Sequence, residues 1–149
     1  MTRINANIKP ADLIDQHLIA EYREIIRIPN VLNSKGYDSN RKYPLEFRLG
    51  TGHVLYFYDK IKFLHKRFLD LKQEMRNRKI TNNIDDSPFM PFVGNPLYND
   101  IHQTKLFDAN LTVIDRIIDR IGTMKRIPTI NGVPVSLDTY GKMMKLKYS

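Results

Sequence analysis

The sequence predicts an all-α fold, a compact single domain over residues 1–149 with three main helices joined by long loops. Apolar residues recur at spacings of three and four along three segments, which is the pattern of helices with one buried face. These segments are residues 11–27, 53–79 and 104–124. The two connections between them are rich in Pro, Gly, Asn or Asp, which is typical of loops. They are residues 30–52 and 80–103.

The first predicted helix has a clear start and end. Asp12 is suited to cap its N-terminus, Pro10 to the entry, and Pro29 to end it. When the segment is projected at about 100° per residue, its apolar side chains occupy one broad arc. That arc consists of Ile14, Leu18, Ile19, Tyr22, Ile25 and Ile26.

The second and third predicted helices each carry a regular apolar stripe, and nearly all Lys and Arg of the second lie off it. The second stripe is Val54, Phe57, Ile61, Leu64, Phe68, Leu71 and Met75. The third is Phe107, Leu111, Ile114, Ile118 and Ile121, with Gly122 near the helix end. Residues 125–149 are interpreted as a basic, irregular tail. Asn131-Gly132 indicates a turn there, but Pro134 argues against a hairpin.

The composition favours a polyanionic partner and excludes several classes of site. The formal net charge is +8 and the isoelectric point is about 9.7, which suits nucleic acid or an acidic membrane surface. Residues 60–79 hold eight Lys or Arg against two Asp or Glu. The absence of Cys excludes disulfides and thiolate metal sites, and the four His have no zinc-ligand spacing. No apolar run is long enough for a membrane span, and the N-terminus has no apolar signal core.

The face of the first helix opposite its apolar arc carries a group of functional side chains. Arg23 and Arg27 are suited to bidentate phosphate contacts, and Gln16 and His17 lie near them on that face. Glu24 admits two interpretations. It is either an ordinary helical ion-pair partner of Arg23 or Arg27, or a carboxylate kept beside phosphate for chemistry. Spacing alone leaves both open.

Two blocks of sequence resemble the pyrimidine-dimer DNA glycosylase family, of the bacteriophage endonuclease V type. The first runs from Met1-Thr2-Arg3-Ile4-Asn5 to Asp15-Gln16-His17-Leu18 and Ala20-Glu21-Tyr22-Arg23-Glu24. The second holds Gly52-His53-Val54, Phe57-Tyr58-Asp59-Lys60, Phe63-Leu64 and Lys66-Arg67, and Tyr140-Gly141-Lys142 is similar to the family's closing segment. The similarity is dense over residues 1–27 and 50–67 and weak over 80–135.

The resemblance implies an enzyme that acts on damaged double-stranded DNA. It implies that the α-amine of Thr2, exposed by removal of Met1, is the nucleophile and that Glu24 is the catalytic carboxylate. Residues lining the DNA cleft would be Arg3, Gln16, His17, Arg23 and Arg27. It further implies an N-terminal segment tucked between helices and a monomer that needs no metal, cofactor or membrane. A phage-encoded member would act in the cytoplasm of its bacterial host.

The chain departs from the family at the segment that helps to read the lesion. That segment is aromatic and contains a Trp in the family, whereas this chain has no Trp and carries Leu137-Asp138-Thr139 before Tyr140. The main hypothesis is a cyclobutane pyrimidine-dimer glycosylase with abasic-site lyase activity. The alternatives are a glycosylase or lyase for another lesion or for abasic sites only, and a non-catalytic basic protein that binds duplex DNA.

Overall fold

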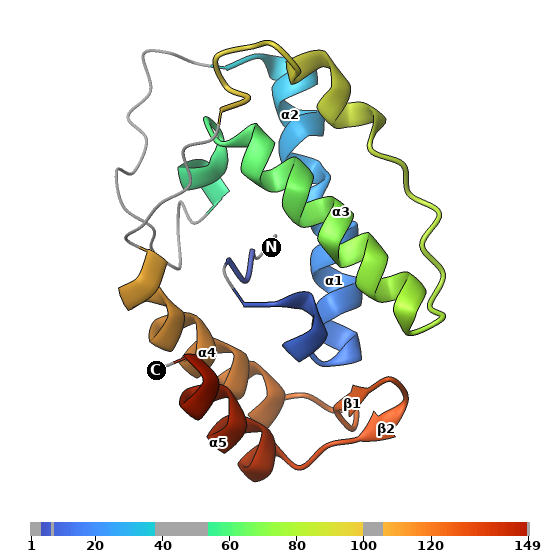
Figure 1. The fold of residues 1–149 in the computed structure, drawn as a ribbon, viewed down its shortest axis with the longest axis vertical. Helices are drawn as coiled ribbons and strands as arrows, with labels where there is room; N and C mark the ends of the chain where they lie inside the picture. The colour runs from blue at the N-terminus through green and yellow to red at the C-terminus, as the bar shows by residue number, and fades with distance from the viewer. Residues whose placement is uncertain (1–3, 7, 38–53, 100–105, 149) are drawn as a thin grey trace.

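The computed structural model describes residues 4–6, 8–37, 54–99 and 106–148, which form a mostly helical molecule (Figure 1). The α-helices in these ranges are α1 (Asp15–Ile25), α2 (Arg27–Lys35), α3 (Ile61–Asn77), α4 (Leu106–Gly122) and α5 (Leu137–Tyr148). The 3-10 turns are Pro10–Asp12, Val54–Phe57 and Ser87–Phe92. One small hairpin pairs β1 (Thr129–Ile130) with β2 (Val133–Pro134). The all-α prediction is therefore confirmed.

The first predicted helix is two helices, and the predictions for Asp12 and Pro29 were wrong. Pro29 lies in the first turn of α2, where a missing N–H costs nothing because that position has no intrahelical acceptor. The N-cap of α1 is Ile14, in extended conformation. The buried Asp12 instead accepts hydrogen bonds from the far end of the chain, from Lys147 Nζ at 2.9 Å and Tyr148 Oη at 2.5 Å.

The predicted seam of the second helix is buried, although the helix is interrupted. A 3-10 turn ends at Phe57, and the non-helical backbone of Lys60 precedes the start of α3 at Ile61. The seam side chains Phe57, Ile61, Leu64, Phe68, Leu71 and Met75 are all at most 1% exposed. The structure does not describe the side chains of Val54, Phe107 and Leu111, which the sequence also places in these stripes. Of the remaining third-helix stripe, Ile114 and Ile121 are buried and Ile118 is partly buried.

Residues 125–149 are not an irregular tail. The Asn131-Gly132 turn has positive φ at both residues, 52° and 79°, which is the backbone that a two-residue hairpin needs. Pro134 is tolerated because β2 is an edge strand, where a missing N–H breaks no ladder. Helix α5 packs along α4 (Figure 1). Gly141 eases that approach, because a Cβ there would lie 3.3 Å from Cδ1 of Ile118, and the Ile118 side chain would have to move by a few tenths of an ångström.

The core joins the N-terminal segment, α1, α3, α4 and α5. Its buried members include Ile4, Ile8, Leu18, Phe68, Ile114 and Met144. Tyr22 of α1 stacks on Phe68 of α3 with ring centroids 5.3 Å apart. The Tyr22 hydroxyl also accepts from the Ile84 amide at 2.9 Å and donates to its carbonyl at 3.2 Å. The long connection after α3 is thereby held against α1.

Candidate active site and nucleic-acid interface

A buried ion pair between α1 and α3 fixes the N-terminal segment. Glu21 is 1% exposed, and its carboxylate accepts hydrogen bonds from Nε and Nη2 of Arg67 at 2.7 and 3.1 Å. The same carboxylate accepts the backbone amide of Asn5 at 3.1 Å and its side-chain amide at 2.7 Å. A buried carboxylate is stable only when it is paired and hydrogen-bonded, and four donors meet that need here. The expected burial of the N-terminal segment is confirmed for residues 4–6, each at most 5% exposed.

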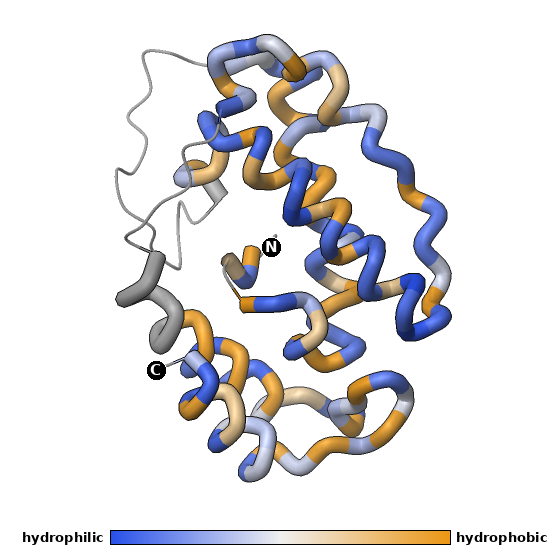
Figure 2. Tube along the Cα trace, viewed as in Figure 1, coloured by the Kyte–Doolittle hydropathy of each residue, from blue (hydrophilic) through white to orange (hydrophobic). Residues whose placement is uncertain are grey.

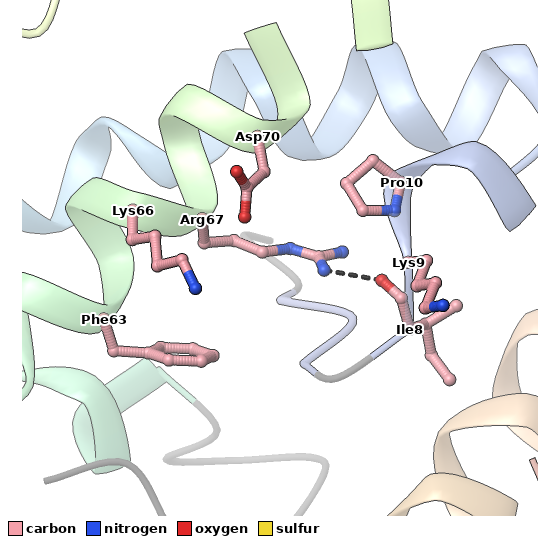
Figure 3. Close-up of a pocket in the computed structure, with 7 residues that line it drawn as sticks. All are labelled: Ile8, Lys9, Pro10, Phe63, Lys66, Arg67 and Asp70. Atoms are coloured by element: carbon pink, nitrogen blue, oxygen red, sulfur yellow. Dashed lines mark hydrogen bonds between the residues drawn. The ribbon is translucent and has the colours of Figure 1, made fainter. Parts of the chain in front are cut away.

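Arg67 also holds the chain after this segment. Its Nη1 donates to the carbonyl of Ile8 at 2.5 Å, across a cavity of about 220 Å³ between α3 and residues 8–10 (Figure 3). The Lys9 amide donates to the hydroxyl of Tyr148 at 2.9 Å, which ties the segment to α5. Residues 4–6 and 8–10 are therefore held by α1, α3 and α5 together.

The exposed end of α1 carries the predicted catalytic carboxylate and one predicted DNA-binding arginine, and the second such arginine begins α2. Arg23 and Arg27 are exposed, and the side chain of Glu24 is 24% exposed. Glu24 Oε1 lies 3.7 Å from Nη1 of Arg27. An exposed pair at this distance stabilises the fold little. The pairing that spacing predicted therefore exists, and it leaves the Glu24 carboxylate accessible.

Gln16 and His17 lie about two turns before Arg23 and Glu24, and their contacts differ from those of the exposed residues. The Gln16 side chain donates to the carbonyl of Ile127 at 2.9 Å and accepts the amide of Thr129 at 3.3 Å. His17 is 5% exposed, and its Nδ1 has no hydrogen-bond partner among the described residues. Burial, with a smaller effect of the Arg120 charge, lowers the pKa of His17 to about 4. The imidazole is therefore neutral at pH 7.

A basic cavity that the sequence interpretation missed adjoins these two residues. Its volume is about 460 Å³, and α1 and the end of α4 form its walls. The lining residues are Gln16, His17, Ala20, Arg120, Thr123, Met124, Lys125 and Arg126. The only signal in the sequence was the positive charge after residue 124. In the folded chain this charge lies beside α1, although the two segments are more than a hundred residues apart in the sequence.

The cations of α3 and of the residues that flank it include buried and exposed ones. Lys60, Arg67 and Arg78 are at most 8% exposed. Lys60 Nζ lies 4.1 Å from the ring centroid of Tyr56, and Arg78 binds Asp15 and Glu74, each at 2.8 Å. These side chains stabilise the fold and cannot contact a nucleic-acid backbone. Figure 2 shows hydrophilic residues along much of the rest of α3, and Lys66, Arg76 and Lys79 are exposed there or just after it.

Thr2 and Arg3, the remaining predicted site residues, lie outside the described residues. Within the described ranges, no three His, Asp or Glu side chains gather closely enough to hold a metal ion. None of the helices described is both long and apolar enough to cross a membrane.

A comparison with known protein families decides the family. The family model described as pyrimidine dimer DNA glycosylase matches residues 1–88. The chain belongs to the pyrimidine dimer DNA glycosylase family. The activity class follows from that membership: a DNA-repair glycosylase that acts on pyrimidine dimers. The match covers α1, α2, α3 and the N-terminal segment that α1 and α3 hold, whereas α4, the hairpin and α5 lie beyond it.

Proposed function

We propose that this glycosylase also cleaves the DNA strand, through an imine between the α-amine of Thr2 and the sugar of the damaged nucleotide. Removal of Met1 would expose this amine. The proposal assigns proton transfer and charge stabilisation to Glu24. It assigns DNA contacts to Arg3, Gln16, His17, Arg23 and Arg27.

The anchoring of Asn5 on Glu21 is the observation that carries the proposal. Glu24 follows Glu21 by three residues on α1, about 4.5 Å further along the helix axis and on a neighbouring face. Thr2 precedes Asn5 by three residues, and a chain of that length spans at most about 11 Å. A tether of that length is short enough to keep the α-amine near the partly exposed Glu24 carboxylate, and the buried pair of Glu21 and Arg67 fixes the Asn5 end of the tether.

An α-amine is a suitable nucleophile for this reaction. Its usual pKa is about 7.7–8.0, against about 10.4 for Lys, so a useful fraction is neutral near pH 7. The nitrogen lone pair bonds to C1′ while the glycosidic bond breaks and its electron pair leaves with the base. Loss of the amine proton and opening of the sugar ring give the protonated imine, which draws electrons from C2′. Removal of a C2′ proton then expels the 3′ phosphate and nicks the strand.

Glu24 is suited to two parts of this sequence. A carboxylate beside the protonated imine stabilises the positive charge, and the same group can accept the C2′ proton. Arg23 and Arg27, one residue before it and three after it, are exposed and suited to contact phosphates. A surface used only for binding would gain nothing from a carboxylate beside phosphate. This face therefore supports catalysis better than simple duplex binding.

Borohydride trapping on a duplex with one abasic site tests the imine. We expect reduction to attach the protein covalently to the DNA, with Thr2 as the first residue in the intact mass. A protein that retains Met1, or carries one residue inserted after it, should not be trapped. Equal trapping of an N-terminally acetylated preparation would contradict the proposed nucleophile.

Glu24→Gln tests the carboxylate, with Asp115→Asn as the matched control. Asp115 also lies in an exposed ion pair at 3.7 Å, with Lys145, so both changes remove a similar pair. Glu24→Gln should lower single-turnover excision and nicking by roughly 10²–10⁴-fold while duplex binding holds or tightens. Asp115→Asn should retain wild-type rates. Cleavage by Glu24→Gln at the wild-type rate would leave Glu24 with only its pairing role.

A further inference from the structure

Residues 125–134, here called the hairpin segment, form a small rigid platform beside α1. The carboxylate of Asp15 accepts the hydroxyl of Thr129 at 2.6 Å and the amides of Asn131 and Gly132, both at 2.9 Å. Gln16 adds its two bonds to Ile127 and Thr129. Three hydrogen bonds to a carboxylate and two to a carboxamide fix the hairpin on the first turn of α1.

The platform leaves two large apolar side chains in solvent. Ile127 is 68% exposed and Val133 is 63% exposed. Lys125 and Arg126, immediately before Ile127, are also exposed and border the basic cavity. Figure 2 shows hydrophobic stretches along this part of the chain. Single exposed apolar residues are common, but these two share one anchored segment with two exposed cations, a combination suited to contact with a nucleic acid.

We propose that the hairpin segment binds the DNA duplex, with Ile127 and Val133 against sugars and base edges in the minor groove. Lys125 and Arg126 bind phosphates on either side. The proposed contact rests on the proposed function. It adds a DNA-contacting element in a region that the family match does not reach. Asp15 is then a positioning residue, because it holds the hairpin and is itself buried. Gln16 both holds the hairpin and lines the basic cavity.

Charge and continuity favour DNA as the occupant of this surface. The hairpin is fixed to the first turn of α1, and the later turns of the same helix carry Arg23 and Glu24. The cavity between them adds Arg120, Lys125 and Arg126. A duplex lying along α1 therefore meets cations from both elements. Apolar side chains inserted from the minor groove partly unstack base steps and bend the duplex, and bending gives access to a damaged nucleotide.

Salt-dependent binding of a duplex with one pyrimidine dimer tests the two kinds of contact separately. Ile127→Ser and Val133→Ser should each weaken binding about tenfold, because each loses the burial of one apolar side chain, and the slope of log K against log salt should stay unchanged. Arg126→Gln should weaken binding and lower the slope by about 0.9, because one fewer counterion is released. Val93→Ser is the matched control, since Val93 is 57% exposed on the connection between α3 and α4. It should bind like the wild type.

The outcomes separate this proposal from the proposed function. If the wild type nicks the duplex but both apolar variants, folded by their denaturation midpoints, bind like Val93→Ser, the hairpin segment is not a DNA contact. A change in sedimentation without a change in DNA binding would assign the surface to a second copy of the chain and overturn the proposal. A wild type that is not trapped on abasic DNA would refute the imine mechanism but leave the binding measurements interpretable.

Discussion

Breaking the pair of Glu21 and Arg67 is expected to be the most damaging single change to the described fold. In Glu21→Gln the shape is kept, but the guanidinium of Arg67 is left 6% exposed without a countercharge. Removing one partner of a buried pair costs about 3–5 kcal/mol. For a chain of this size that corresponds to a fall in Tm of about 6–20 °C.

Urea denaturation at pH 7 of a double-mutant cycle measures the coupling. Glu21→Gln and Arg67→Met should each destabilise strongly, and the double variant should lose less than the sum because no uncompensated charge remains. Lys142→Met is a suitable control, since its partner Asp138 lies 3.2 Å away and both side chains are about 80% exposed. Its denaturation midpoint should hardly move.

Strand nicking gives the cycle a second readout. Because Glu21 holds Asn5, the folded fraction of Glu21→Gln should nick more slowly even when DNA binding is unchanged. Losses below about 1 kcal/mol, or single changes that add without coupling, would refute the view that this pair fixes the N-terminal segment.

Two further predictions concern Asp15 and His17. Burial alone raises the pKa of Asp15, but hydrogen bonds from Thr129, Gly132, Arg78 and Asn131 outweigh it and lower the pKa below 3.8. Asp15→Asn should therefore speed amide exchange at the hairpin turn and at the C-terminal end of α3, where Arg78 loses one of its two carboxylate partners, but not in α5. The carboxylate's contribution to stability should disappear as pH falls below about 4. Burial lowers the pKa of His17 from 6.5 to about 4. The wild type should therefore lose up to about 3 kcal/mol between pH 6.5 and 4, as the unfolded chain takes up the proton, and His17→Asn should lack this loss in urea titrations at the two pH values.

Local patterns in the sequence predicted the features that repeat along one helix. The seam from Phe57 to Met75 lies in the core because its spacing follows the helical period. The same pattern could not show that α1 ends at Ile25, since the apolar arc continues through Ile26 into α2. Nor could it show α5, where Gly141 lowers the helix propensity but permits close packing against Ile118.

The candidate site was predicted in part, for a related reason. Arg23, Glu24 and Arg27 share an accessible face, as their spacing predicts. Gln16 and His17 look equivalent to them on a helical projection. The structure separates them because Gln16 binds the hairpin and His17 is buried beside α4, and both contacts join residues more than a hundred positions apart. A helical projection contains no information about such contacts.

Helix α1 holds three segments and presents the candidate catalytic face between these attachments. Its first turn binds the hairpin through Asp15, its second turn binds the N-terminal segment through Glu21, and Tyr22 binds the connection after α3. Each attachment uses a side chain that is at most 8% exposed. The polar side chains left accessible on the later turns are those of Arg23 and Glu24, with Arg27 just beyond. The anchor of the proposed nucleophile, the proposed catalytic carboxylate and the proposed groove-binding hairpin thus all depend on α1, so a shift of this helix would displace all three together.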